Sequence, residues 1–305
     1  MMAPSSLMKP NKLAIIQARM SSSRLPGKVM SEVAGRPMLQ YMLERVRNAR
    51  LIDGVLLATT TDPSDDVLEK WCQGQALPCY RGSLHDVLDR YFQAATQYQA
   101  EVIIRLTADC PLIDPEILDL TVNLFLGNTR SLATLDPSQS LIDQSPGAPS
   151  FDFAANRLPP PWKRSLPIGL DVEVCSLYAL ERAWKEARER YQREHVMPYL
   201  YEGVTFAGSE PSLPPGWYRQ QGITPRGFRV ALLNHEPDYG SLRWTVDTPE
   251  DLEFIRAIAE RFEGRTGFGW QEVLDLLERE PELSLINQKV KHKSAFDVDR
   301  RSHIP

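Results

Sequence analysis

The sequence predicts an α/β fold with a mainly parallel central sheet and helices on both faces of that sheet. Two observations support this prediction. Short apolar runs alternate along the chain with longer segments whose apolar residues recur at helical spacing. The runs are continuous in apolar residues, as is typical of parallel strands that helices cover on both sides. Connections between neighbouring parallel strands should be right-handed.

The elements follow one another in a regular order. The expected strands cover residues 13–16, 54–59, 77–80, 102–106, 172–174 and 242–246. The expected helices begin at or just after Pro37, Pro63, Leu84, Pro115, Ser176 and Thr248. The last helix has a strong start signal, because Thr248 can cap it, Pro249 suits its first position and two acids follow. Ligands of such sheets bind beyond the carboxyl ends of the strands, so we expect one crevice there.

Composition shifts predict how the chain is organised. The expected boundaries are 12–263 for one main domain, about 136–168 and 202–240 for two loop-rich insertions within it, 264–287 for a C-terminal helical extension, and 1–11 and 288–305 for flexible tails. Seven prolines from Asp136 to Pro167 favour a long loop over a helix. Proline and glycine are also frequent over residues 208–227.

Bulk properties exclude several classes of protein. The 305 residues carry a formal net charge of -5, which gives no polybasic surface for nucleic acid. No stretch is long and apolar enough to span a membrane, and residues 1–11 lack the apolar core of a secretory signal. The four cysteines show neither zinc-type pairing nor a dense disulfide framework. We therefore expect a cytoplasmic protein with reduced thiols.

A basic loop follows the first expected strand. Residues 17–28, QARMSSSRLPGK, contain Arg19, Arg24 and Lys28 among serine hydroxyls and a Pro-Gly turn. Because the whole chain is acidic, this is a local concentration of positive charge at the expected crevice. Backbone N–H groups, hydroxyls and arginines can all bind phosphate oxygens. The loop matches neither the Walker pattern nor the dinucleotide glycine pattern, so it predicts a phosphate site of another kind.

Two aspartates stand where strands are expected to end. Asp109 lies shortly after the strand at 102–106, and Asp247 directly follows the run at 242–246. Asp114, which precedes Pro115, suits the cap of the next helix and so leaves Asp109 for another role. Two carboxylates at one crevice could share a Mg²⁺ ion with a triphosphate. For Asp247, a role in the cap of the following helix is an equal alternative.

Six ordered segments together resemble a known family. They cover residues 17–28, 81–91, 107–115, 169–174, 193–196 and 243–252. In this combination they resemble the cytidylyltransferases of the CMP-sugar synthetase group, most closely the type of spore coat polysaccharide biosynthesis protein F. The CMP-KDO synthetases are more distantly similar. The resemblance spans most of residues 12–263 and implies a glycosyltransferase-A-like nucleotidyltransferase fold for that domain.

The resemblance also implies a site and a reaction. The reaction is transfer of CMP from CTP to a sugar or sugar acid, with release of pyrophosphate, for cell-surface polysaccharide or glycan biosynthesis. Arg19, Lys28, Asp109 and Asp247 are the implied catalytic residues, and the two aspartates would hold Mg²⁺. The implied nucleotide-binding residues are Ala18, Arg19, Arg24, Lys28, Arg81, Thr107 and Asp109. The implied sugar-binding residues are Asp171, Glu173 and His195.

Alternatives remain at this point. A sugar-phosphate nucleotidyltransferase that uses another NTP fits the same segments. A catalytically inactive nucleotide-binding protein of this fold is a second alternative, because Ser21, Ala108 and Ile168 replace the family's usual Gly, Gly and Arg. Retention of the cations and of both aspartates argues against it. His195 could act as a base, although a structural role is favoured. The sequence leaves the oligomeric state open, and many relatives pair as dimers.

Overall fold

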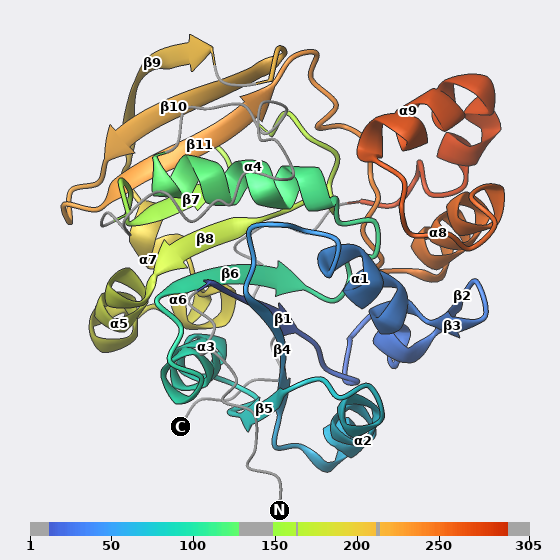
Figure 1. Ribbon diagram of the computed structural model, residues 1–305, viewed down its shortest axis with the longest axis horizontal. Helices are drawn as coiled ribbons and strands as arrows, with labels where there is room; N and C mark the ends of the chain where they lie inside the picture. Colours follow the sequence, from blue (N-terminus) through green and yellow to red (C-terminus); the bar gives the residue numbers. More distant parts are fainter. Residues whose placement is uncertain (1–11, 128–148, 163, 212–213, 292–305) are drawn as a thin grey trace, which may run out of the picture.

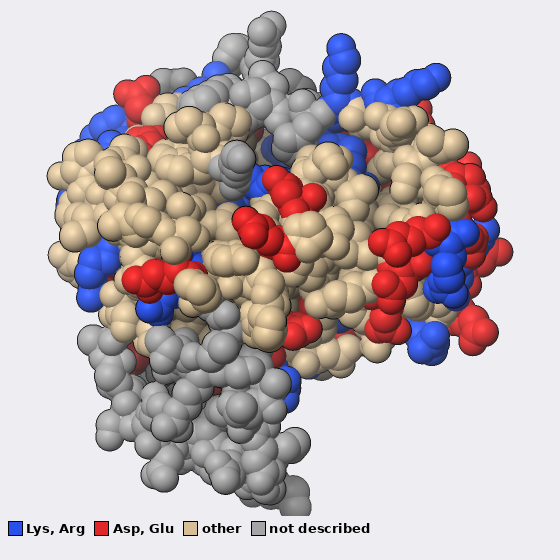
Figure 2. Space-filling model, turned by 90° about the horizontal axis from the view of Figure 1, so that it is seen from above, with Lys and Arg blue, Asp and Glu red and all other residues tan. Residues whose placement is uncertain are grey.

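The computed structural model describes residues 12–127, 149–162, 164–211 and 214–291. A nine-stranded sheet runs through the molecule and helices pack on both of its faces (Figure 1). This arrangement confirms the predicted α/β class. Within the described ranges, no helix has the length and apolar character needed to cross a membrane. On the face shown in Figure 2, the described basic side chains lie scattered among acidic ones and form no continuous patch.

The first four strands of the large sheet are parallel. Its strands are β1 (Lys12–Gln17), β4 (Gly54–Thr60), β5 (Cys79–Gly82), β6 (Val102–Thr107), β7 (Phe153–Ala155), β8 (Glu173–Ser176), β9 (Thr205–Pro211), β10 (Trp217–Ile223) and β11 (Arg229–His235). Their order across the sheet is β5-β4-β1-β6-β8-β7-β11-β10-β9. β1 pairs in parallel with β4 and β6, and β4 pairs in parallel with β5. A separate two-stranded sheet joins β2 (Glu32–Val33) and β3 (Arg36–Pro37).

The second half of the large sheet is mixed. β8 is antiparallel to both β6 and β7, while β11 is parallel to β7. Residues 202–240, expected to be rich in loops, instead contain the three antiparallel strands β9, β10 and β11. That expectation was wrong because Pro214, Pro215 and Gly227 lie in the turns between the strands. β9 and β10 are largely polar, whereas β11 has a buried apolar run at residues 230–233. Strand β7 also lies within the expected loop at 136–168, of which residues 128–148 are outside the described residues.

The helices form two layers. They are α1 (Met38–Val46), α2 (Asp66–Gly74), α3 (Val87–Gln97), α4 (Pro115–Leu126), α5 (Leu177–Glu186), α6 (Arg190–His195), α7 (Pro198–Tyr201), α8 (Pro249–Arg261) and α9 (Trp270–Arg279), with short 3-10 turns η1 (Lys28–Met30), η2 (Pro63–Asp65) and η5 (Pro281–Leu285). Ala14 and Ile16 of β1 belong to the core shared with α1, α2, α4, α8 and α9. Leu13 and Ile15 belong to the core shared with α3, α5 and α7. Alternation along one strand thus places side chains in both cores.

Two predicted helix starts are confirmed in atomic detail. The Asp114 carboxylate accepts hydrogen bonds from the backbone N–H groups of Glu116 and Ile117 at the start of α4. Thr248 and Asp251 form a capping box at the start of α8, with Pro249 in the first turn. On α2, by contrast, Val67 is 43% exposed. It lies beside the buried Leu68, on the solvent side of the helix.

The segment before α8 departs from the prediction. Residues 242–246 were expected to form a strand, but the structure has only an isolated bridge between Ile168 and Arg243. The backbone of Val246 instead donates to the carbonyl of Asp109, at 2.8 Å. The polypeptide therefore reaches the end of β6 without joining the sheet. Residues 264–287 contain α9 and η5, whereas the expected tails, residues 1–11 and nearly all of 288–305, lie outside the described residues.

Candidate active site

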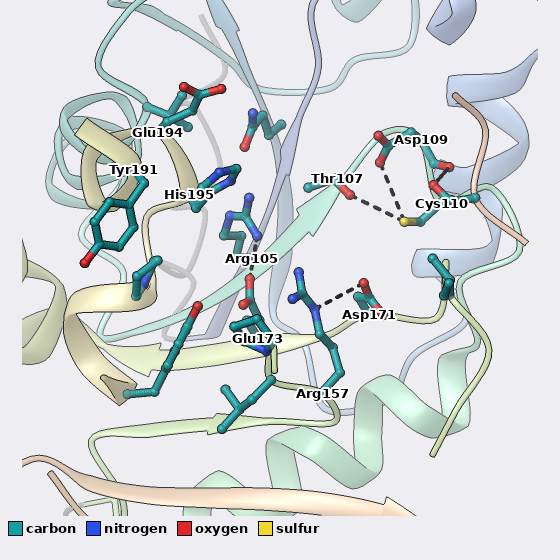
Figure 3. A pocket seen from close by; sticks show the side chains of 18 of the residues that line it. Arg105, Thr107, Asp109, Cys110, Arg157, Asp171, Glu173, Tyr191, Glu194 and His195 are labelled. Atoms are coloured by element: carbon teal, nitrogen blue, oxygen red, sulfur yellow. Dashed lines mark hydrogen bonds and ion pairs between the residues drawn. The ribbon is translucent and has the colours of Figure 1, made fainter. Parts of the chain in front are cut away.

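A cavity of about 1090 Å³ lies beyond the carboxyl ends of β1 and β6, where the crevice was expected. Gln17 and Arg19 line it from the end of β1, and Thr107 and Asp109 from the end of β6. Figure 3 shows Thr107 and Asp109 on one side of the cavity and Tyr191 and His195 on the other, with Arg105 between them. The cavity therefore has two ends that different chain segments build.

A buried lysine joins two carboxylates at the first end. Lys28, which is 7% exposed, places Nζ 3.1 Å from Oδ2 of Asp109 and 3.1 Å from Oδ1 of Asp247. The same ammonium donates to the carbonyl of Val246 at 2.6 Å. Burial alone would lower the pKa of Lys28, but Asp109 and Asp247 outweigh burial and raise that pKa. Lys28 is therefore a fixed positive charge, held between two negative ones.

Asp247 forms ion pairs with two further cationic side chains. Its Oδ2 lies 2.6 Å from Arg24 and 3.0 Å from Arg243. Burial acts to raise the pKa of Asp247, but Lys28 and Arg24 outweigh it and lower that pKa to about 2. The carboxylate is therefore ionised at every physiological pH. It holds Lys28 and Arg24 in place beside the cavity.

A buried aspartate outside the loop, Asp65, holds the basic loop in shape. Asp65 is fully buried, and its Oδ1 accepts a hydrogen bond from the backbone N–H of Met20 at 2.7 Å. Its Oδ2 accepts from both the backbone and the hydroxyl of Thr60. Gly27 closes the loop with φ of 74°, a left-handed conformation that glycine adopts at little cost. Asp65 therefore fixes the path of the loop that carries Arg19 and Arg24.

Ion pairs line the cavity between its two ends. Arg105 of β6 pairs with Glu173 of β8, and Arg164 pairs with Asp171. Arg157 also contacts Asp171, at 3.3 Å. Among the residues implied for sugar binding, Asp171 and Glu173 therefore have arginine partners that sequence reasoning did not identify. Arg105 was within the expected strand at 102–106 but was not singled out, and Arg157 and Arg164 lie in a segment expected to be a loop.

His195 stands at the second end of the cavity, beside Tyr191, as a neutral side chain. It lies at the end of α6 and lines the cavity. Burial lowers the pKa of His195 to about 4, and the positive charges of Arg105 and Arg157 act in the same direction. The imidazole is thus uncharged at neutral pH. An uncharged imidazole can both donate and accept a hydrogen bond, which suits contact with hydroxyl groups.

The comparison with known proteins identifies the family. Residues 13–263 match the cytidylyltransferase family, which is most of the chain. This protein belongs to the cytidylyltransferase family. The spore coat polysaccharide biosynthesis protein SpsF of Bacillus subtilis is 31% identical, over 88% of this chain and 95% of its own. The 3-deoxy-manno-octulosonate cytidylyltransferase of Trichlorobacter lovleyi is 34% identical, over 79% of this chain and 95% of its own.

A solved structure agrees with this assignment to the family. The cytidylyltransferase of Leptospira borgpetersenii superposes with a TM-score of 0.72 at 30% sequence identity, covering 92% of this chain and 99% of that one. The match confirms the expected nucleotidyltransferase fold. This cytidylyltransferase therefore has both the sequence and the architecture of its family.

Three residues implied for nucleotide binding, Arg81, Ala18 and Lys28, do not line the cavity of this cytidylyltransferase. Arg81 pairs with Asp66 and Glu69 of α2 and donates to the carbonyl groups of Thr60 and Asp62. These contacts direct its guanidinium toward α2. Ala18 is 3% exposed, and its backbone N–H donates to Ala58. Arg19, Arg24, Thr107, Asp109 and Asp247 do line the cavity, and Lys28 lies directly behind the two aspartates.

The carboxylates at the first end fit a magnesium ion that is coordinated jointly by the protein and by a nucleotide. Magnesium in proteins takes one or two carboxylates and completes its shell with phosphate oxygens and water. Oδ1 of Asp109 contacts only the Cys110 thiol, at 3.6 Å, among the hydrogen bonds of the described residues. Both oxygens of Asp247, in contrast, already have cationic partners. The described residues contain no group of three or more metal-binding side chains, so substrate oxygens would have to complete the shell.

Proposed function

We propose that this cytidylyltransferase transfers CMP from CTP to a hydroxyl group of a sugar or sugar acid and releases pyrophosphate. The observation that carries the proposal is the cluster of Lys28, Arg24, Asp109 and Asp247 at one end of a cavity of about 1090 Å³. A site of this kind needs positive charge for a triphosphate and space beside it for an acceptor. The names of the Bacillus and Trichlorobacter relatives support polysaccharide biosynthesis and a sugar-acid acceptor.

The basic loop would bind the triphosphate. Arg19 and Arg24 line the cavity and can each contact two phosphate oxygens, while Lys28 acts as a point charge. In-line attack on the α-phosphorus moves negative charge onto the leaving pyrophosphate. Cations placed beforehand offset that charge without reorganisation during the reaction. This gives Arg19, Arg24 and Lys28 a role in stabilising the transition state as well as in binding CTP.

Asp109 and Asp247 would hold a magnesium ion against the phosphates. The ion, when bound, supplies positive charge that polarises the α-phosphate. Asp109 lines the cavity, and its Oδ1 contacts only the Cys110 thiol among the hydrogen bonds of the described residues, whereas Asp247 must share its oxygens with Arg24 and Lys28. We infer that Asp109 is the principal carboxylate ligand. Asp247 then contributes mainly by orienting the two cations.

The part of the cavity beyond the first end would bind the acceptor. Thr107 lies beside Asp109 at the first end and can hydrogen-bond the nucleoside. Asp171, Glu173 and the neutral His195 supply hydrogen-bonding groups suited to sugar hydroxyls, and Arg105 and Arg157 hold the two carboxylates in place. An ordered set of acceptors and donors fixes the attacking hydroxyl relative to CTP, which is the main source of rate in such a reaction.

The test is a panel of nucleotides and acceptors. Pyrophosphate release is measured with CTP, UTP, ATP and GTP, with and without Mg²⁺, and with 3-deoxy-manno-octulosonate, other sugar acids, neutral sugars and sugar phosphates. Release that requires CTP, Mg²⁺ and a sugar or sugar acid supports the proposal. Preference for another NTP with a sugar phosphate would overturn it in favour of a sugar-phosphate nucleotidyltransferase. Binding of CTP without turnover of any acceptor would favour an inactive nucleotide-binding protein.

Two further properties complete the proposal. We place the enzyme in the cytoplasm, because CTP is available there and the described cysteines form no disulfide. We also propose a homodimer, on the basis of the family resemblance. Light scattering on the purified chain measures its mass, and a monomer at micromolar concentration would contradict the dimer.

A further inference from the structure

Asn287 lies outside the family-matched residues 13–263 and yet contacts the segment that leads to the cavity. It is 5% exposed, just beyond η5 in the C-terminal extension, here residues 264–291. Its Nδ2 donates to the carbonyl of Arg243 at 3.0 Å and to Oδ1 of Asp251 at 3.1 Å. The C-terminal extension is therefore linked by hydrogen bonds to the residues on either side of Asp247.

Asp251 and Arg243 form a buried ion pair beside residues 244–248, the segment that contains Asp247. Asp251 is fully buried, and its two oxygens accept from Nε and from one terminal nitrogen of Arg243, both at 2.9 Å. Oδ2 of Asp251 also accepts from the backbone N–H groups of Asp247 and Thr248, at 2.9 and 3.0 Å. A carboxylate with this many donors fixes both the arginine and the loop backbone.

The same arginine reaches Asp247. A terminal nitrogen of Arg243 lies 3.0 Å from Oδ2 of Asp247, the oxygen that also contacts Arg24 at 2.6 Å. Oδ1 of Asp247 holds Lys28. A continuous chain of polar contacts therefore runs from Asn287 through Asp251 and Arg243 to Asp247. Its far end is the pair of cations beside the cavity.

We propose that Asn287 is a positioning residue for the nucleotide site: through Asp251 and Arg243 it holds Asp247 in the orientation that aims Arg24 and Lys28 at the phosphates. The inference rests on the proposed function, which assigns those cations to the triphosphate. Loss of the Asn287 amide leaves the Arg243 carbonyl and Oδ1 of Asp251 with one donor fewer in a buried setting. Residues 244–248 can then move, and Arg24 and Lys28 are no longer held in one orientation by Asp247. The C-terminal extension is on this view part of the active site.

The test measures binding of two probes, CTP with Mg²⁺ and inorganic pyrophosphate, by isothermal titration calorimetry. The variants are Asn287→Ala and Asn287→Asp, the second of which sets a carboxylate against that of Asp251. Leu283→Ala is the matched control, because Leu283 is 4% exposed in the same extension and is apolar. Each variant is also made in an Asp247→Asn background. Thermal unfolding of each protein reports loss of stability separately from loss of binding.

We expect Asn287→Ala to weaken binding of CTP about tenfold, the usual scale for a residue that orients a ligand-binding group. Asn287→Asp should weaken it further, and Leu283→Ala should lower the melting temperature without changing the Kd. In the Asp247→Asn background the Asn287→Ala change should have little further effect, because the residue through which Asn287 acts is already altered. A role in stability alone would give the same loss in both backgrounds.

Three outcomes decide between this inference and the proposed function. If wild type binds CTP and Asn287→Ala binds it equally well, or loses as much affinity in both backgrounds, the positioning role is wrong and the function stands. If wild type binds pyrophosphate without CTP, and Asn287→Ala weakens pyrophosphate binding, the positioning role stands and the CTP assignment is wrong. If wild type binds neither probe, both are overturned.

Discussion

Nζ of Lys28 lies 3.1 Å from Oδ2 of Asp109, although the two residues are 81 positions apart in the sequence. Lys28 comes from the loop after β1, and Asp109 from the loop after β6. β1 and β6 are parallel neighbours in register from Lys12 to Gln17, so their following loops emerge side by side. The contact places a cation and a carboxylate at one wall of the cavity.

Replacement of Lys28 by methionine should remove most turnover. Methionine keeps much of the length and the apolar stem but leaves Asp109 and Asp247 without the shared cation. We expect kcat to fall by at least about 100-fold, the scale for losing a group that stabilises transition-state charge. Pyrophosphate release from CTP is the measurement. Lys12→Met is the control, since Lys12 lies at the other end of β1 and, among the described residues, pairs with Asp53; near-normal turnover by Lys28→Met would contradict the role of Lys28.

Much of the first end of the cavity could be predicted from local sequence. Buried parallel strands bring their carboxyl ends to one edge, so residues shortly after β1 and β6 had to meet there. Asp247 lies at the same edge although its segment is not a strand. The carbonyl of Val246 accepts a hydrogen bond from Lys28, and the N–H of Val246 donates to the carbonyl of Asp109. Lys28, Asp109 and Asp247 therefore lie together as expected, although residues 242–246 do not form the expected strand.

The remainder depends on contacts between distant segments. Arg81 was expected at the cavity, but ion pairs with Asp66 and Glu69 of α2 hold it away from the cavity. Local sequence does not show whether an arginine at this position will pair with the acids of a neighbouring helix or point into the cavity. Asn287 lies 44 positions beyond Arg243, and its contact appears only once the C-terminal extension packs against the domain. β9 and β10 escaped prediction because much of their surface is exposed and polar, and the buried apolar run at 230–233 in β11 was missed next to a segment rich in proline and glycine.

Asp247 should make stability depend on pH in an acidic window. Its pKa in the folded protein is about 2, below the ordinary value of 3.8. A lowered pKa stabilises the folded state above the ordinary value, and the stabilisation disappears as pH falls from about 4 to about 2. We expect the contribution to be about 2 kcal/mol. Urea unfolding of wild type and Asp247→Asn should give free energies that converge over this window; a constant difference would contradict it.

His195 should make stability depend on pH in a second, less acidic range. Its pKa in the folded protein is about 4, against 6.5 when unperturbed, because it is buried near Arg105 and Arg157. Below pH 6.5 the unfolded chain takes up a proton that the folded chain excludes, so stability is lost as pH falls from about 6.5 to about 4. The loss should approach about 3 kcal/mol. Urea unfolding at pH 7 and 4.5 tests this. His195→Gln cannot titrate and should lose less stability across that interval; an equal loss would show that another group is responsible.

Arg45 should stabilise the junction between the sheet and the C-terminal extension. It is fully buried and donates to the carbonyl groups of Ile113, Thr266 and Phe268 at 2.9 to 3.1 Å. Arg45→Met would leave these carbonyl oxygens buried without that donor, at a cost of about 3–5 kcal/mol in the free energy of unfolding. Arg47→Met, one position beyond the helix on the exposed side, is the control and should change it by less than about 0.5 kcal/mol. Similar values for the two variants would contradict this role.

Gly169 should be intolerant of even a methyl group, for two separable reasons. Its φ is +111°, and a Cβ there would lie 2.6 Å from the carbonyl carbon of Trp244, in the segment that leads to Asp247. Gly35 also has a positive φ, +77°, but a Cβ there would meet nothing within 4 Å. Gly35→Ala therefore measures backbone strain alone, about 1 kcal/mol. Gly169→Ala adds a backbone clash, so we expect a loss of at least about 3 kcal/mol in unfolding free energy together with weaker CTP binding. Equal losses for the two variants in urea unfolding would mean that the Trp244 backbone can move aside, and that close packing of residues 168–169 against 243–245 does not fix the loop.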